Sequence, residues 1–151
     1  MNESAFTHWL DAYGRAWENR DPRAAAELYA EDGTYQVTPF LDPMRGHQSI
    51  LDYWTEVAKT ENRISFRYDV LALSEELGIA HWQATFIRTP PGLATKLDGI
   101  FVIRLNAEEN ALRCASGGTN NSSELPSPDP APPARIWLKG KAEIQQTVAR
   151  A

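Results

Sequence analysis

The sequence of 151 residues contains a single cysteine, Cys114, so it can form neither a disulfide within the chain nor a cysteine cluster around a metal. It has no apolar run of membrane-spanning length, and its first residues lack the basic-then-apolar order of a secretory signal. Its Lys and Arg residues are scattered in a chain of net charge −5, which argues against nucleic-acid binding. We therefore expect a cytoplasmic protein that binds neither nucleic acid nor membrane.

Chemical motifs are also scarce. No metal-ligand spacing, phosphate-binding loop or nucleophile–base motif is recognisable, so the sequence predicts no metal and no cofactor. Apolar residues make up 42% of the chain and charged residues 23%, which is ordinary for a globular protein whose length suits one domain. Aromatic residues are abundant by contrast, with five Trp, five Tyr and five Phe.

The first sixty residues have mainly the period of helices. Ser4 is a suitable N-cap for a first helix, and Asp21 followed by Pro22 is typical of a second helix start, which should run as far as Gly33. A third helix is expected from about His47. The apolar stripe of the first helix consists of Phe6, Trp9, Leu10, Tyr13, Ala16 and Trp17.

The apolar period changes to two in the second half of the chain, which is typical of strands. Strands are expected at residues 34–40, 63–73, 78–88 and 96–105. Helices followed by a run of adjacent long strands predict an α+β fold, in which three N-terminal helices cover one face of an antiparallel sheet.

Many aromatic side chains should point into this helix–sheet interface. Each of them alone is explained at least as well by a place in the core, but together they predict a cavity with amphipathic walls. Our candidate ligand-binding residues are Trp9, Trp17, Tyr35, Phe40, Tyr53, Trp54, Phe66 and Trp82.

Three segments of the sequence resemble one known family. "AYGRAWENRDPRAAAELYAEDGTYQVTPF", "MRGHQSILDYW" and "LDGIFVIRLN" are similar to SnoaL-like members of the nuclear transport factor 2-like (NTF2-like) superfamily, over residues 5 to about 106. The resemblance implies a cone-shaped α+β barrel, with a curved sheet around the helices, a pocket at the open end, and a homodimer formed through the exposed sheet face. Enzymes, carriers and protein-binding modules share this fold, so the resemblance does not decide the chemistry.

The resemblance also bears on Tyr13, our first catalytic candidate. This residue lies where ketosteroid isomerase relatives carry a tyrosine that binds an oxyanion, although a core tyrosine explains it about as well. The base of those isomerases corresponds to residues 36–38, which read Gln-Val-Thr, and their second acid corresponds to Phe101. Chemistry of that type is therefore not expected.

His81 and Asp98 are the other catalytic candidates. They lie on neighbouring predicted strands and can pair as a base and the group that orients it. If they face solvent, they form an ordinary polar pair across the sheet. The second interpretation is favoured, because His81 lies opposite the aromatic face that carries Trp82.

The end of the chain loses its apolar pattern. We expect an incomplete SnoaL-like domain over residues 1–112, and an irregular Pro-, Ser- and Asn-rich tail with a terminal helix over residues 113–151. Codons for Asn110 to Asn121 permit, in a shifted frame, the family ending Ser-Leu-Arg-Glu-Trp-Trp-His. We hypothesise a frameshift near Ala107 to Glu109, which would leave a sheet edge unpaired and weaken the dimer; a native tail is the alternative, and the gene's nucleotides decide between them.

The sequence thus predicts a small-molecule-binding protein. One interpretation is an isomerase, lyase or hydrolase that acts on an apolar polycyclic or aromatic compound. The other is a non-catalytic carrier or a dimeric interaction module. An acid or histidine with a shifted pKa inside the cavity would favour the enzyme.

Overall fold

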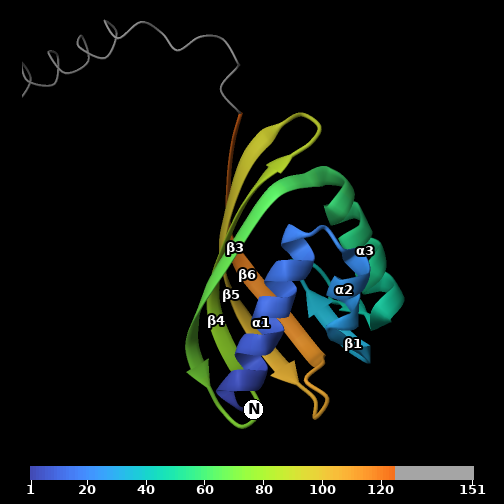
Figure 1. Ribbon diagram of the computed structural model, residues 1–151, viewed down its shortest axis with the longest axis vertical. Helices are drawn as coiled ribbons and strands as arrows, with labels where there is room; N and C mark the ends of the chain where they lie inside the picture. The colour runs from blue at the N-terminus through green and yellow to red at the C-terminus, as the bar shows by residue number, and fades with distance from the viewer. Residues whose placement is uncertain (125–151) are drawn as a thin grey trace, which may run out of the picture.

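A computed structural model describes residues 1–124, which form three helices and one six-stranded sheet (Figure 1). Among these residues no helix is long and apolar enough to cross a membrane. The elements are α1 (Glu3–Glu18), α2 (Pro22–Glu27), β1 (Tyr29–Gln36), β2 (Met44–Arg45), α3 (Gly46–Thr60), β3 (Glu61–Leu73), β4 (Gly78–Arg88), β5 (Leu93–Leu105) and β6 (Ala111–Glu124).

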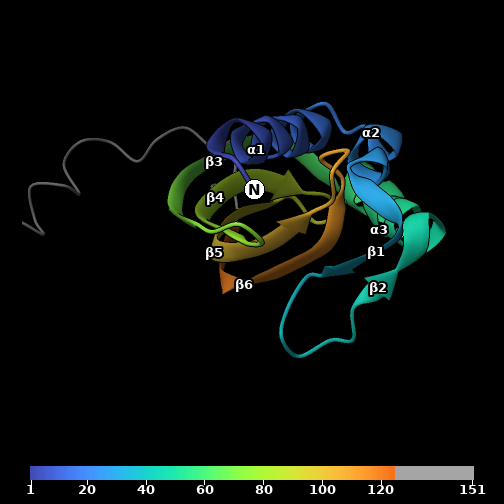
Figure 2. The same cartoon turned by 90° about the horizontal axis from the view of Figure 1, so that it is seen from below.

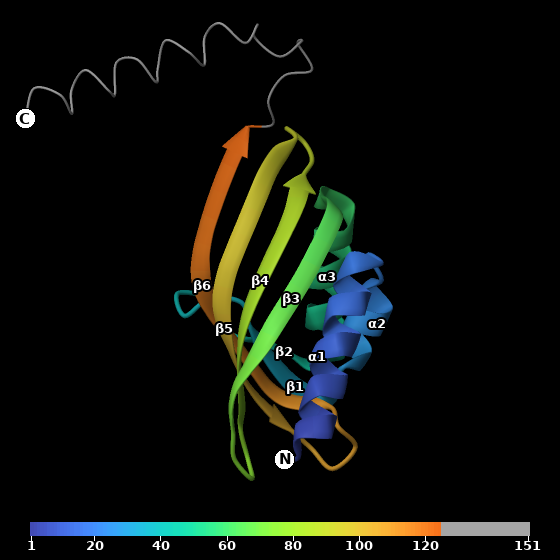
Figure 3. The ribbon, with the colours of Figure 1, turned by 60° about the vertical axis from the view of Figure 1, so that its left-hand side comes forward.

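The sheet is strongly curved, and the helices lie on its concave side (Figure 2). Its strand order is β2-β1-β6-β5-β4-β3, and all pairs are antiparallel except β1 with β6. The four long strands β3 to β6 lie side by side and form the wide wall of the cone (Figure 3). This architecture confirms the predicted α+β cone.

Side-chain caps fix the starts of the first two helices. Asn2, rather than the predicted Ser4, caps α1, because its Oδ1 accepts a hydrogen bond from the Ala5 N–H at 2.7 Å. Asp21 caps α2 as predicted, since its Oδ1 accepts from two backbone N–H groups of the first turn. The caps orient two helices whose apolar residues then face the sheet.

The second helix is shorter than the sequence predicts. It ends at Glu27 instead of near Gly33, and β1 begins at Tyr29. Pairing with a distant strand explains the difference, because the Ala111 N–H donates to the Leu28 carbonyl at 2.8 Å and the Tyr29 side chain is buried. A contact between residues so far apart in the sequence has no local signal.

Strand β6 corrects the expectation for the end of the chain. Residues 113–124 were predicted to be irregular, yet β6 pairs with β5 from Ala111 to Glu124 and with β1 around Cys114. The small side chains of Cys114 and Ser116 are buried beneath the aromatic core. Strand β6 is therefore stabilised by backbone pairing and close packing of small residues, without the alternating large apolar residues that usually mark a strand. The folded domain therefore extends to Glu124 at least.

This strand also removes one ground for expecting a weakened dimer. The predicted unpaired edge is occupied by β6, whose residues 117–124 pair with β5. The frameshift itself concerns nucleotides and stays a prediction. The remainder of the predicted tail, including its terminal helix, lies outside the described residues.

The core at the helix–sheet interface is largely aromatic. Every residue of the predicted α1 stripe is buried, and the Tyr13 ring contacts rings of three other elements, α3, β3 and β5. Its ring centroid lies 5.1 Å from that of Phe101 on β5 and 5.3 Å from that of Trp54 on α3. Such ring pairs each add to the stability from buried area and hold the helices in a defined position over the sheet.

Candidate functional site

A cavity of about 230 Å³ lies between the helices and the concave face of the sheet. Strand β6 supplies one wall with small and polar residues, among them Ser116, Gly118 and Asn120. The facing walls are rings contributed by both helices and strands. These ring residues are Tyr13, Trp17, Tyr35, Tyr53, Trp54 and Trp82.

Glu61 is the acidic residue among those lining the cavity, and only 5% of it is exposed. Trp17 Nε1 donates to its Oε2 at 2.9 Å, and Arg88 Nη2 donates to its Oε1 at 3.1 Å. Burial raises the pKa of the Glu61 carboxyl, and the hydrogen bonds from Trp17 and Arg88 only partly oppose this effect. Glu61 is therefore an ionisable group held inside an aromatic cavity.

A bulge in β3 explains why Glu61 faces the cavity. Strict alternation along β3 would place Glu61 opposite to Ile64 and Phe66, on the outer face. Between Asn62 and Ser65, however, the pairing register with β4 shifts by one residue, and Arg63 adopts a positive φ of 53°. The extra residue reverses the parity, so that Glu61 and Phe66 both point inward. Sequence reasoning missed Glu61 because a period of two cannot predict such a bulge.

Arg88 lies opposite Glu61, and the two are paired residues of β3 and β4. The side chain of Arg88 is 43% exposed, whereas that of Glu61 is 7% exposed. The guanidinium carbon lies 5.3 Å from the centre of the Phe86 ring, which supports it by a cation–π contact. Arg88 therefore joins the buried carboxyl to the opening of the cavity.

Tyrosine hydroxyls line another part of the cavity. The hydroxyls of Tyr13 and Tyr35 lie 3.0 Å apart. Burial raises the pKa of both groups well above the ordinary value, and burial raises the pKa of Tyr53 to about 12. All three phenols stay protonated at neutral pH; one of Tyr13 and Tyr35 donates to the other, and the remaining hydroxyl can donate to an oxygen of a bound molecule.

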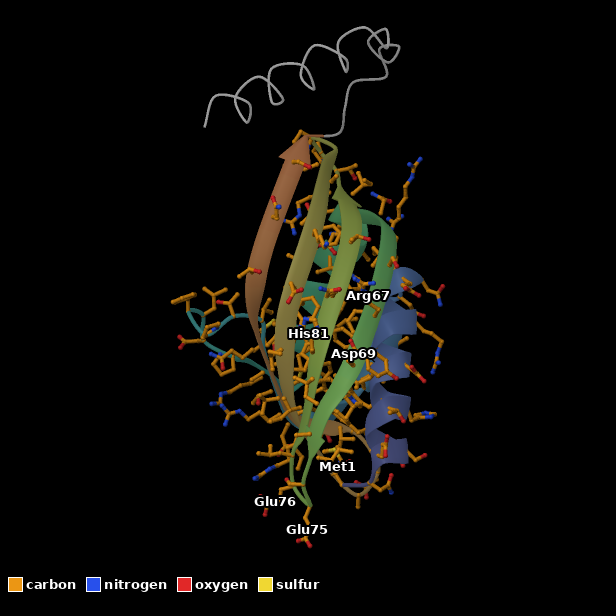
Figure 4. All side chains as sticks on the ribbon, turned by 90° about the vertical axis from the view of Figure 1, so that its left-hand side faces the viewer. Met1, Arg67, Asp69, Glu75, Glu76 and His81 are labelled. Atoms are coloured by element: carbon orange, nitrogen blue, oxygen red, sulfur yellow. The ribbon has the colours of Figure 1, made fainter. Side chains whose placement is uncertain are left out.

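His81 and Asp98 are paired as the sequence predicted, with 2.9 Å between Nε2 and Oδ1. Their side chains are partly exposed, and His81 lies on the outer face of the sheet beside Asp69 and Arg67 (Figure 4). The amide of Gln83, and then His81, lower the pKa of Asp98 by hydrogen bonding. This placement contradicts a catalytic role in the cavity and agrees with the alternative of a polar pair across the sheet.

The predicted ligand-binding residues fall into two groups. Trp9 is buried away from the cavity, where its Nε1 donates to the Leu28 carbonyl at 2.9 Å, and Phe66 packs behind Tyr13. Phe40 is 94% exposed, because β1 ends at Gln36, and it does not line the cavity as the sequence analysis expected. Those that do line the cavity are Trp17, Tyr35, Tyr53, Trp54 and Trp82.

No group of three His, Cys, Asp or Glu side chains within residues 1–124 is arranged to hold a metal ion. The cavity chemistry that these residues offer is therefore that of one carboxyl, one guanidinium and several phenols. Each of these groups comes from a different helix or strand of the cone.

Comparisons with known proteins identify the family. The model of the SnoaL-like domain matches residues 10–111. A search of curated proteins gave no significant match. Among solved structures, the epoxide hydrolase/cyclase-like enzyme SalBIII, described as acting in pyran ring formation in the polyether salinomycin, superposes with a TM-score of 0.69 at 15% identity, covering 78% of this chain and 93% of the other.

Two further structures have the same fold. An NTF2-like protein of unknown function from Exiguobacterium sp. 255-15 gives a TM-score of 0.63 at 19% identity, over 74% of this chain and 98% of the other. A computationally designed 17-OHP binder gives 0.69 at 14% identity, over 79% and 97%. With the cone fold and the match over residues 10–111, the chain belongs to the SnoaL-like domain family within the NTF2-like fold.

Proposed function

We propose that this protein is an enzyme that binds a small, largely apolar or aromatic compound in the cavity and transfers a proton through Glu61. The observation that carries the proposal is the position of Glu61, a buried carboxyl with a raised pKa among aromatic walls. General bases in enzymes are tuned in this way toward the working pH. A cavity of about 230 Å³ suits a compound of about one or two rings.

Glu61, on β3, would supply the base that residues 36–38 lack, and the phenols would supply hydrogen-bond donors. The ionised carboxylate of Glu61 takes a proton from a carbon next to a carbonyl of the ligand, and the electron pair moves onto the carbonyl oxygen. A protonated phenol, Tyr13 or Tyr35, donates a hydrogen bond to that oxygen as its negative charge develops. If Glu61 returns the proton to another carbon, the ligand is isomerised; if the electron pair instead expels a leaving group, the reaction is that of a lyase.

A hydrolase would use the same carboxylate differently. Glu61 would take a proton from a water molecule as the water oxygen attacks the ligand, and the departing oxygen of the ligand would accept a proton from a phenol or from solvent. The structural likeness to the enzyme SalBIII is consistent with catalysis in this fold. Because identity is 15%, that likeness supports the fold alone and leaves the choice among the three reactions to experiment.

A non-catalytic carrier is the second candidate. The aromatic lining from four elements supports it, because rings bind apolar molecules without any acid or base. The likeness to a designed 17-OHP binder is consistent with simple binding in this fold.

Two steps separate the candidates. A thermal-shift screen with one- and two-ring aromatic ketones first identifies compounds that bind. Proton NMR in D₂O then measures whether the protein exchanges the protons next to the carbonyl of each binder. The enzyme exchanges them, and Glu61→Gln keeps binding while exchange falls about a hundredfold or more. Tyr13→Phe lowers exchange less, by about tenfold.

His81→Ala is the matched control, since His81 lies on the outer face, and we expect unchanged exchange. A wild-type protein that binds ketones without exchanging their protons is a carrier. Exchange that persists in Glu61→Gln at the wild-type rate would contradict the role of Glu61.

We also propose a homodimer formed through the outer face of the sheet, in a cytoplasmic protein. Exposed apolar residues on that face, including Ile100 and Val102 of β5, support this pairing. Light scattering coupled to size-exclusion chromatography tests it, with a monodisperse dimer as the expected result. Val102→Glu should convert this dimer to a monomer.

A further inference from the structure

The guanidinium of Arg88 has hydrogen-bonding capacity that its partner does not use. Of its donors, Nη2 bonds to Glu61, whereas Nε and Nη1 have no hydrogen-bond partner among residues 1–124. Arg88 is also the one Lys or Arg residue among the described residues that line the cavity. An arginine presents five N–H donors in a planar fork that matches a carboxylate.

The surroundings hold this fork in place. The Phe86 ring lies beneath the guanidinium, with 5.3 Å from its centre to the guanidinium carbon, and Glu61 fixes one Nη2 donor. Because the side chain is 43% exposed, the charge stays near solvent while the rings of Trp17 and Tyr53 lie deeper in the cavity. A ligand with a charged end and an apolar body would match this gradient.

The open donors of the Arg88 guanidinium, together with its partial exposure, favour an anion over a neutral group at this position. Glu61 is the acidic residue facing Arg88 in the cavity, and it accepts a hydrogen bond from Nη2, so Nε and Nη1 stay open. Tyr53 from α3 also faces Glu61, and with a pKa of about 12 it carries no charge at neutral pH. A carboxylate supplied by the ligand would accept charge-assisted hydrogen bonds from the donors that Glu61 leaves open.

We propose that Arg88 anchors a carboxylate of the ligand through its Nε and Nη1 donors, so that the compound taken into the cavity is an aromatic or apolar carboxylic acid. This inference rests on the proposed function and specifies its substrate class. Arg88 then acts as a positioning residue, which places the apolar body of the acid against the rings and within reach of Glu61.

The test compares two probes of equal size, 2-naphthoate and its neutral amide 2-naphthamide. Quenching of tryptophan fluorescence measures their binding, because Trp17, Trp54 and Trp82 line the cavity. We expect the wild-type protein to bind the acid about tenfold or more tightly than the amide, as charge-assisted hydrogen bonds predict. In Arg88→Gln this preference disappears, while affinity for the amide changes less than about threefold.

Arg67→Gln is the matched control, because Arg67 also lies on a strand of the sheet but on its outer face (Figure 4), and it should keep the preference for the acid. A second measurement uses the wild-type protein alone and so does not depend on the folding of a variant. In ¹⁵N–¹H spectra of arginine side chains, 2-naphthoate should shift the Arg88 Nε–H resonance, and 2-naphthamide should not.

Equal affinity of the wild-type protein for the two probes would overturn the inference and leave the proposed role of Glu61 standing. A preference for the acid that survives in Arg88→Gln, or an unshifted Arg88 Nε–H resonance, would also overturn it. If neither probe binds, the inference fails, because the cavity then accepts no aromatic acid of this size, while proton exchange of one-ring ketones by the wild type and Glu61→Gln still decides the proposed function.

Discussion

Two acid–base pairs lie on the same sheet, one on each face, and they differ in every property that matters for chemistry. Glu61 and Arg88 face the aromatic cavity, and burial raises the pKa of the carboxyl. His81 and Asp98 lie on the outer face, where hydrogen bonds lower the pKa of the carboxyl. The comparison teaches that the face of the strand, more than the residue type, decides whether a carboxyl is a candidate base.

The largest expected effect concerns apolar neighbours on the two faces of β5. Phe101 is fully buried, whereas Val102 is 37% exposed on the opposite face. Phe101→Ala should lower the free energy of unfolding by about 3–5 kcal/mol, because it opens a hole among the rings around Tyr13. Val102→Ala should cost less than about 1 kcal/mol. Urea denaturation measures both, and similar losses would contradict the assignment of the two faces.

The cations of the two faces should differ by a smaller amount. Arg88→Met removes one donor from the buried Glu61 carboxyl, so the free energy of unfolding at neutral pH should fall by about 1–3 kcal/mol. Arg67→Met, on the outer face, removes hydrogen bonds to the half-buried Gln83 and should cost less than about 0.5 kcal/mol. Urea denaturation of both variants in the same buffer gives the comparison. An Arg67→Met loss as large as that of Arg88→Met would mean that burial of Glu61 has no energetic consequence.

The phenols allow a finer test of the same contrast. Tyr13→Phe leaves the buried Tyr35 hydroxyl without its partner at 3.0 Å and should cost about 1 kcal/mol. Tyr68→Phe removes a more exposed hydrogen bond to Asp11 of 2.7 Å and should cost about 0.5 kcal/mol or less. Thermal unfolding followed by circular dichroism resolves such differences, and the reverse order would contradict the placement of Tyr13 in the cavity.

The smallest expected effect is on the pH dependence of stability, to which Glu61 and Asp98 should contribute with opposite signs. The pKa of Glu61 is raised above its ordinary value of 4.5, so the stability of the wild type relative to Glu61→Gln should be greatest in acid and fall as pH rises. The pKa of Asp98 is lowered below its ordinary value of 3.8, so the stability relative to Asp98→Asn should be present above that value and be lost as pH falls. Unfolding free energies between about pH 2.5 and 8 give the two slopes, because the Asp98 contribution changes only below about pH 4. Slopes of the same sign would refute the contrast between the two carboxyls.

Much of the fold follows from local patterns that the sequence displays. The stripe from Phe6 to Trp17 predicts α1 and its buried face, and the alternation over residues 78–88 predicts β4 to the residue. Strand β6 was missed because its residues are small and polar, and only pairing with β5 and β1 makes them a strand. Local propensity cannot report a partner that lies elsewhere in the chain.

The candidate site was predictable only in part, for a similar reason. Ring residues such as Trp17 and Trp82 lie on a regular helix or strand, so their spacing correctly predicts that their side chains face the cavity. Glu61 lies at the junction of α3 and β3, next to the bulge at Arg63, where neither helical nor strand periodicity applies. The one carboxyl that matters most is thus found at the place where the sequence pattern is interrupted.

The most direct test of the central claim is an NMR titration of the side-chain carboxyl carbons of Glu61 and Asp98 in one ¹³C-labelled sample, with and without 2-naphthamide. We expect the pKa of Glu61 to lie above 4.5 and that of Asp98 below 3.8, and the amide should move the Glu61 resonance while leaving Asp98 unchanged. A Glu61 carboxyl that titrates at its ordinary value and ignores the amide would contradict the claim that it is a buried acid–base group in a ligand cavity.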